Sequence, residues 1–191
     1  MPLPSSALLS PHFTAYELGA DRPEATLTIV NNLRMVADTL ERVRAVLGVP
    51  LQANTANHLN RGFRPPDSNI IAGGSPTSDH PRGLAGDIVP LGYAGGMLGA
   101  YNALRNAYDA GSLGPFDQII LYPIQGHIHV GIGERLRGEF RVYIYEGSGG
   151  IPLVSADTIK ALGGRATLFI TAHPLLSLLV VVVAIVLILP S

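Results

Sequence analysis

The sequence contains no cysteine and no tryptophan, and only 6% of its residues are aromatic. The absence of cysteine excludes disulfide bonds and cysteine-ligated zinc, so any transition metal must be held by histidine and carboxylate groups. Lys160 is the single lysine, and the arginines that supply the remaining positive charge are scattered along the chain. With a formal net charge of -1, nothing in the charge pattern indicates a nucleic-acid partner.

The 191 residues are enough for one domain with a hydrophobic core and an extension. We expect no secretory signal, because Pro2 and Pro4 interrupt the short apolar stretch at the N-terminus. No charged residue occurs from Ala166 to Leu189, and a membrane-spanning helix needs roughly 20 apolar residues. We therefore expect a folded domain over 1–146, a Gly- and Ser-rich linker over 147–165 and one transmembrane helix over 166–189. A buried core helix or strand is the alternative for this last segment.

Apolar residues from Leu27 to Leu47 recur at three- and four-residue steps, with polar and charged residues between them. This spacing predicts an amphipathic helix opened by Pro23-Glu24 and ended by Gly48. A second helix is expected from Ala94 to Ala110.

The remaining apolar segments of the first 146 residues are short, and several alternate apolar and polar residues as half-buried strands do. Strands are expected at residues 51–55, 84–89, 117–122, 127–132 and 140–145, a loop at 57–66 and a short helix at 154–162. Two helices and several short strands joined by tight connections indicate an α+β domain, with helices packed on a small, mainly antiparallel sheet.

Two clusters of metal-binding residue types stand out. His80 and Asp87 are seven positions apart and separated by two glycines, which permit a tight backbone path. His127 and His129 are two positions apart on a predicted strand, so their side chains point to the same face. His80, Asp87 and His129 together offer three ligands and leave one position open, the ligand count of a catalytic zinc site. A chance pair of surface histidines is the alternative for His127 and His129.

The segment Ser78-x-His80-x-x-Gly83-x-Ala85-x-Asp87 resembles the signature of the M15 family of zinc D-Ala-D-Ala carboxypeptidases and related peptidoglycan endopeptidases. Other segments are similar to the parts of the family that surround this signature, so the resemblance runs from about residue 8 to about residue 145. These segments are residues 10–18, 60–69, 116–120 and 129–130.

The resemblance implies the α+β fold shared by hedgehog and D-Ala-D-Ala-peptidase domains, and a Zn²⁺ ion held by His80, Asp87 and His129. It also implies that Arg64 stabilises the oxyanion that develops during hydrolysis and contacts substrate, and that Ser78 contacts substrate. Two structural roles are the alternatives: Arg64 could hold its own proline-rich loop, and Ser78 could cap the loop before His80.

The general base departs from the family pattern. Many members carry Glu or Asp three residues before the last histidine ligand, where this sequence has Gly126. A related, wider group uses the first histidine of His-x-His in catalysis, which implies this role for His127. Asp117, on the preceding strand, is the alternative base, or a partner that orients a ligand histidine.

The function expected from the resemblance is zinc-dependent hydrolysis of amide bonds in peptidoglycan stem peptides or cross-links. D-Ala-D-Ala carboxypeptidase and L-Ala-D-Glu endopeptidase activities fit equally, and the compact size would suit a phage or prophage enzyme associated with lysis or tail proteins. The alternative is a membrane-anchored or virion structural or binding module that retains the zinc fold without catalysis.

The expected location is the membrane, through the C-terminal helix, with the catalytic domain acting at the cell wall; a phage virion component is the alternative. Lys160 and Arg165 precede the apolar run, which favours a cytoplasmic catalytic domain. The predicted substrate lies on the other side, and the sequence leaves this topology open.

Overall fold

The structure is a computed structural model that describes residues 2–54, 61–123 and 125–144 and three further strands at Ile151–Ser155, Leu168–Phe169 and Ala184–Ile185. The chain divides into two compact units, Met1–Leu153 and Val154–Ser191. The first unit holds every residue predicted to take part in the functional site. Most of the predicted linker, residues 147–165, lies outside the described residues.

The longest helix, α2 (Leu27–Leu47), confirms the predicted amphipathic helix. It begins at Leu27 rather than at Pro23 because the Thr26 side chain accepts a hydrogen bond from the Ile29 backbone N–H and so caps its first turn. Gly48 ends it with a φ of 66°. The other helical segments are α1 (Ala15–Leu18), α3 (Pro66–Ile71), the 3₁₀ helix η1 (His80–Arg82) and α4 (Gly96–Asp109).

The main sheet has six strands in the order β3-β4-β6-β5-β7-β8, and a separate two-stranded sheet is formed by β1 (Leu8–Ser10) and β2 (Phe13–Thr14). The strands of the main sheet are β3 (Leu51–Gln52), β4 (Ala85–Pro90), β5 (Gln118–Tyr122), β6 (His127–Gly131), β7 (Glu139–Ile144) and β8 (Ile151–Ser155). Strand β6 thus lies between β4 and β5 and is antiparallel to both.

The predicted mainly antiparallel sheet is wrong in one respect, because β5 and β7 run parallel and the sheet is mixed. The loop 132–138 connects the end of β6 to the start of β7 on the far side of β5. The starts of β5 and β7 are in register, with Gln118 opposite Glu139, and the end of β6 pairs at the same level through Gly131. A strand that returns after so short a loop must run opposite to β6 and therefore parallel to β5.

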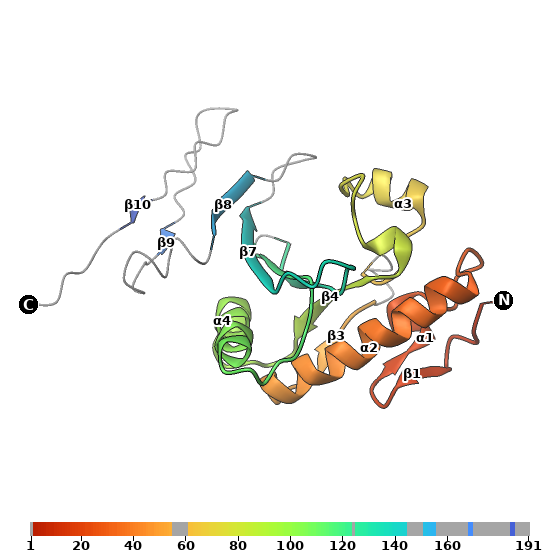
Figure 1. The fold of residues 1–191 in the computed structure, drawn as a ribbon, viewed down its shortest axis with the longest axis horizontal. Coiled ribbons are helices and arrows are strands. Elements are labelled where there is room, and N and C mark those ends of the chain that lie inside the picture. The colour runs from red at the N-terminus through yellow and green to blue at the C-terminus, as the bar shows by residue number, and fades with distance from the viewer. Residues whose placement is uncertain are drawn as a thin grey trace, which may run out of the picture. The chain divides into compact units, whose positions relative to one another are not determined.

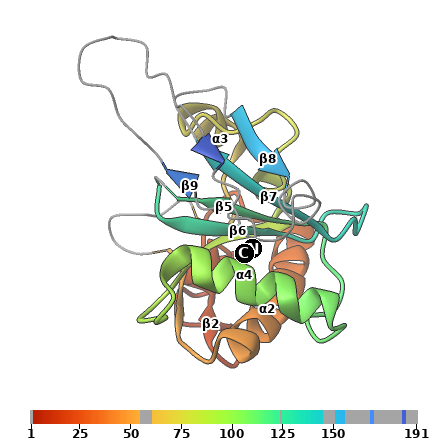
Figure 2. The same ribbon diagram turned by 90° about the vertical axis from the view of Figure 1, so that its left-hand side faces the viewer.

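Helices α2 and α4 cover one face of the main sheet, while α3 lies on the opposite side (Figures 1 and 2). The helix-covered face forms the hydrophobic core, to which the strands contribute alternate apolar residues. From β5 these are Ile119 and Leu121, from β6 Ile128 and Val130, and from β7 Phe140. The residues between them point to the other face, as the two-residue period of a strand requires.

The predicted transmembrane helix over 166–189 is wrong. Among the described residues, no helix is long and apolar enough to cross a membrane. The parts of the segment that the structure describes are instead two short antiparallel strands, β9 (Leu168–Phe169) and β10 (Ala184–Ile185). Strand β10 contains Ile185, and β-branched residues of this kind favour strands over helices.

Two further local predictions are corrected. The loop predicted at 57–66 ends one residue earlier, because Pro66 begins helix α3 and proline is well suited to the first turn of a helix; residues 57–60 lie outside the described residues. The helix expected at 154–162 overlaps β8, which includes Val154 and Ser155, and residues 156–162 lie outside the described residues.

Candidate metal centre

His80 and Asp87 are brought together by a 3₁₀ turn followed by a strand. His80 is the first residue of η1, which ends at Gly83 with a φ of 67°, and Asp87 lies within β4. Glycine is favoured at this positive φ, and a Cβ there would also come within 3.0 Å of the Ile29 side chain on α2. The glycine therefore permits both the sharp turn and the close approach of the site to the long helix.

Asp87 and His129 are direct neighbours across the antiparallel pair β4–β6. Directly opposite residues in such a pair project to the same face. The strand insertion described above thus brings a histidine from far along the chain beside the His80 and Asp87 pair.

The three side chains form one compact and buried group. Asp87 Oδ1 lies 3.2 Å from His80 Nε2 and 2.8 Å from His129 Nδ1, and these two nitrogens are 3.1 Å apart. Each residue is 4–6% exposed. Three ligand atoms of these types, all within 4.8 Å of one another, could hold a metal ion. This group is the one predicted from the sequence.

The ring of His80 is fixed from behind by a backbone carbonyl. Its Nδ1 lies 2.7 Å from the Gly62 oxygen, so Nδ1–H donates to that oxygen and Nε2 presents its lone pair to the other two ligand atoms. A side chain at Gly62 would collide with the Leu18 backbone. The N-terminal helix α1 therefore supports the loop that orients this histidine.

His127 lies beside the three-residue group, on the same face of β6 as His129. Its Nε2 is 3.8 Å from Asp87 Oδ2, and its ring stacks on Tyr122, its direct partner on β5, with centroids 4.8 Å apart. Burial lowers the pKa of His127, and the charges of His129 and Arg61 lower it further, although Asp87 raises it. The net shift keeps the ring neutral at neutral pH, the state in which it can accept a proton.

Asp87 is held as a carboxylate by its neighbours. Burial raises its pKa, but the charge and hydrogen bond of His80 and the hydrogen bond of His129 outweigh burial and hold the pKa well below its usual range. The Arg64 guanidinium also donates from Nη2 to Asp87 Oδ2 at 3.4 Å. The same side chain donates from Nη1 to Asn69 of α3 at 3.4 Å, so Arg64 both faces the site and holds its own loop.

Ser78 lines the cleft and caps η1 at the same time. Its Oγ accepts a hydrogen bond from the His80 backbone N–H at 3.3 Å. The capping role expected as the alternative for this serine is therefore present. Contact with substrate stays a prediction.

Asp117 lies apart from the three-residue group. It precedes β5 and follows the alternation of Ile119 and Leu121 rather than that of Gln118 and Ile120, and it does not line the cleft. Both of its oxygens accept hydrogen bonds from Arg137, from Nε and Nη2, each at 2.9 Å. These hydrogen bonds lower the pKa of Asp117, which burial alone would raise. Its carboxylate is thus engaged in holding loop 132–138 and does not face the three-residue group.

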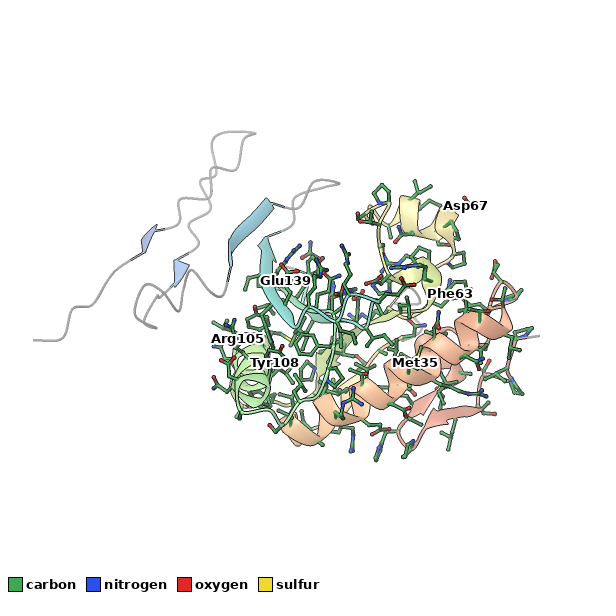
Figure 3. All side chains as sticks on the ribbon, viewed as in Figure 1. Met35, Phe63, Asp67, Arg105, Tyr108 and Glu139 are labelled. Atoms are coloured by element: carbon green, nitrogen blue, oxygen red, sulfur yellow. The ribbon has the colours of Figure 1, made fainter. Side chains whose placement is uncertain are left out.

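The group opens into a polar cleft with a volume of about 690 Å³. One wall is the segment from Ala72 to Asp79, between α3 and η1. The floor is the face of the sheet opposite to α2 and α4, and Figure 3 shows Glu139 of β7 on this side of the strands, away from Arg105 and Tyr108 on α4. Arginines of loop 132–138 and β7 form the other wall, namely Arg135, Arg137 and Arg141. An extended peptide could lie along such a cleft.

Sequence reasoning missed several contributors to the site. The Gly62 carbonyl gives no sequence signal, because any residue carries a backbone oxygen. The stacking of Tyr122 on His127 depends on the register of β5 against β6, which periodicity does not provide. The three arginines of the wall are far from the recognised motifs, and only the parallel return of β7 brings Arg141 to the cleft.

The donors fit a divalent transition metal. Two imidazole nitrogens and one carboxylate oxygen converge from one side, and the cleft leaves the opposite side accessible, as in catalytic zinc sites with three protein ligands. The His80 ring is already held in the tautomer that such binding needs.

Comparison with known proteins gives a consistent result. The family model for peptidase M15 matches residues 11–131, which include all of the residues described above from Arg64 to His129. A search of the curated proteins finds no match. Peptidases of this family are zinc-dependent, in agreement with the His80, Asp87 and His129 group. The match covers more than half of the chain, and the chain belongs to the peptidase M15 family.

Proposed function

We propose that the chain is a zinc-dependent peptidase that hydrolyses amide bonds in peptidoglycan stem peptides or cross-links. The observation that carries the proposal is the buried group of His80, Asp87 and His129 on the floor of an open cleft, with a fourth side chain, His127, beside it. A D-Ala-D-Ala carboxypeptidase and an L-Ala-D-Glu endopeptidase would both use these residues. The substrate of either activity is part of the cell wall.

His80, Asp87 and His129 would hold the zinc ion through Nε2, Oδ1 and Nδ1. When bound there, zinc would polarise the scissile carbonyl and lower the pKa of a water molecule to near neutrality. The buried carboxylate contributes one negative charge, which balances part of the charge of the ion. The remaining chemistry falls to side chains that line the cleft around this group.

His127 is placed to accept the proton of the attacking water at Nε2. That atom lies 3.8 Å from Asp87 Oδ2, so it faces the same small volume as the ligand atoms. The lowered pKa makes the ring available as a neutral base, and the resulting imidazolium can return the proton to the leaving amine. Stacking on Tyr122 restricts the ring to this orientation.

Arg64 is the nearest cation to the group. Its guanidinium lies 3.4 Å from Asp87 Oδ2 and lines the cleft, where it can stabilise negative charge on the carbonyl oxygen during attack. Ser78 lines the same cleft, and we expect its hydroxyl to contact the substrate backbone.

The proposal is tested with the purified full chain by measuring bound zinc and peptide release from peptidoglycan together. We expect about one zinc per chain and new amino termini in the digest. His80→Ala should lose zinc and activity together, whereas the matched control His12→Ala should keep both, because His12 is exposed and bonds to Glu41 rather than facing the cleft.

Stoichiometric zinc without released peptide, under conditions in which a known peptidoglycan peptidase is active, would contradict hydrolysis. That outcome would support the non-catalytic binding module. Mass spectrometry of released fragments distinguishes the two activities, since a carboxypeptidase releases single D-Ala residues and the endopeptidase cuts between L-Ala and D-Glu.

A further inference from the structure

The two histidines of the candidate metal centre differ at the ring nitrogen that faces away from the other ligand atoms. In His80 this nitrogen, Nδ1, donates to the Gly62 oxygen at 2.7 Å. In His129 the corresponding nitrogen, Nε2, is buried and has no hydrogen-bond partner among the described residues. Buried polar nitrogens without a partner are rare, so this one calls for a physical explanation.

His129 presents Nδ1 to His80 and Asp87, at 3.1 and 2.8 Å. A neutral imidazole that binds a metal through Nδ1 must carry its proton on Nε2. Ligand histidines nearly always donate this second N–H to a carboxylate, a carbonyl or a water molecule, which fixes both tautomer and ring orientation. His129 therefore needs an acceptor next to Nε2.

Asp79 is the carboxylate that faces this position. It directly precedes His80 and is 4% exposed. Its Oδ1 forms an ion pair with Arg82. Its Oδ2 has no hydrogen bond within the described ranges 2–54, 61–123 and 125–144. It faces the end of β6 and the loop that follows, where a Cβ at Gly131 would lie 3.3 Å from it and a Cβ at Gly133 3.0 Å from it.

Gly131 separates the two groups. A Cβ at this position would lie 3.3 Å from His129 Nε2 and 3.3 Å from Asp79 Oδ2, so these two atoms can be no farther apart than about twice that distance. The missing side chain leaves a space between a buried donor and a buried acceptor. That space is lined on its third side by Gln118, whose Cγ would lie 3.1 Å from the same Cβ.

We propose that Asp79 is a positioning residue for the third metal ligand: its Oδ2 accepts a hydrogen bond that is relayed from His129 Nε2–H through one water molecule in the space left by Gly131. This bond holds the ring with Nδ1 facing His80 and Asp87. The other oxygen, Oδ1, forms the ion pair with the half-exposed Arg82 side chain and leaves Oδ2 available. The inference rests on His129 acting as a metal ligand, as in the proposed function.

Other acceptors near this space are less suitable. Asp117 and Asp79 both face Gly133, but both oxygens of Asp117 accept hydrogen bonds from Arg137, and Asp117 is not among the three nearest neighbours of a Cβ at Gly131. Gln118 touches the space with an aliphatic carbon, and its neutral amide is a weaker acceptor than a carboxylate. Gln118 is the rival that the experiment must exclude.

The test measures Zn²⁺ affinity of the full chain by competition with a chromophoric chelator, which does not depend on catalysis. We expect Asp79→Asn to weaken affinity about 10- to 100-fold, the range found when the partner of a ligand histidine is lost. Gly131→Ala should weaken it similarly, because its methyl group would fill the space between the two atoms. Arg82→Met, which removes the ion pair but keeps the carboxylate, should change affinity less than threefold, as should Gln118→Leu.

A second measurement reads the tautomer itself. In the zinc-loaded wild-type protein, ¹⁵N-detected histidine spectra, assigned with His129→Gln, should show His129 bound to the metal through Nδ1 and protonated at Nε2. Asp79→Asn should lose this preference. Circular dichroism of each metal-free variant separates loss of the bond from loss of the fold, and the wild-type spectrum decides the matter even if a variant does not fold.

Wild-type protein that binds no zinc would overturn the proposed function itself. Zinc binding in wild type with unchanged affinity in Asp79→Asn would overturn only the role of Asp79. Equal weakening in Asp79→Asn and Arg82→Met would show that Asp79 merely anchors η1, and weakening in Gln118→Leu alone would assign the role to Gln118. A His129 ring bound to zinc through Nε2 in the wild-type protein would also overturn the inference.

Discussion

The two faces of the main sheet carry residues of opposite kinds on the same strands. The face under α2 and α4 holds only apolar side chains from β5 and β6, all of them at most 1% exposed. The face toward the cleft holds one apolar residue, Ile120, together with Gln118, Tyr122, His127 and His129 from the same two strands. Neighbouring residues thus point in opposite directions: His127 and His129 face the cleft, and Ile128 between them faces the core. We expect substitutions one position apart to change different properties.

The largest effect expected from this contrast is on catalysis. His127→Ala should lower kcat by about 10²- to 10⁴-fold, the usual contribution of a general base, while zinc affinity and thermal stability stay close to those of wild type. Steady-state kinetics on a peptidoglycan fragment measure kcat, and thermal unfolding measures the stability. A fall in stability as large as that of a core variant would show that the two faces are not independent.

The adjacent residue should show the converse. Ile128 is fully buried under the helices, and Ile128→Ala should lower the free energy of unfolding by about 2–5 kcal/mol through lost burial and a cavity. Below the unfolding temperature, kcat should remain within a few-fold of wild type. Urea unfolding gives the first quantity. A large loss of kcat in protein shown to be folded would mean that the packing under β6 sets the position of the histidines.

A smaller effect is expected at Asp117, which is charged but does not face the cleft. Asp117→Asn should lower the free energy of unfolding by about 1–3 kcal/mol, because the buried group loses its charge-assisted hydrogen bonds to Arg137. Activity should fall far less than in His127→Ala. A loss of kcat equal to that of His127→Ala would instead assign the base to Asp117.

The same carboxylate predicts a pH dependence of stability. The hydrogen bonds from Arg137 lower the folded-state pKa of Asp117 below that of the unfolded chain, about 3.9. The stabilisation is therefore fully present above pH 4 and is lost as the pH falls through the lower, folded-state pKa. The difference in unfolding free energy between wild type and Asp117→Asn should be large at pH 6 and small at pH 2. A difference independent of pH would mean that the ion pair adds no stability.

Sequence reasoning was most successful where spacing within one short segment decides the geometry. The turn from His80 to Asp87 and the same-face pair of His127 and His129 both follow from local backbone rules, and the structure places these side chains together. The amphipathic pattern of α2 likewise identifies its buried face.

What sequence reasoning missed depends on how distant segments meet. The parallel pairing of β5 with β7 follows from the path of loop 132–138, which no local pattern specifies. The predicted transmembrane helix relied on the length, apolarity and lack of charge of the run, its position at the end of the chain and its lack of an amphipathic face. It neglected the strand preference of β-branched residues such as Ile185. The partners behind the ligands, Gly62 and Asp79, reach the site through a carbonyl and through a gap at a glycine, neither of which leaves a recognisable motif.

The central position of β6 also has a kinetic consequence. Strands β4 and β5 each precede β6 in the chain, and β6 must enter between them with hydrogen bonds to both sides. His129 therefore meets His80 and Asp87 only when these long-range pairings form, and such pairings tend to form slowly. During refolding, the capacity to bind metal should appear with the last phase of sheet assembly, after helix α2 has formed. The time at which metal binds therefore reports when the fold is complete.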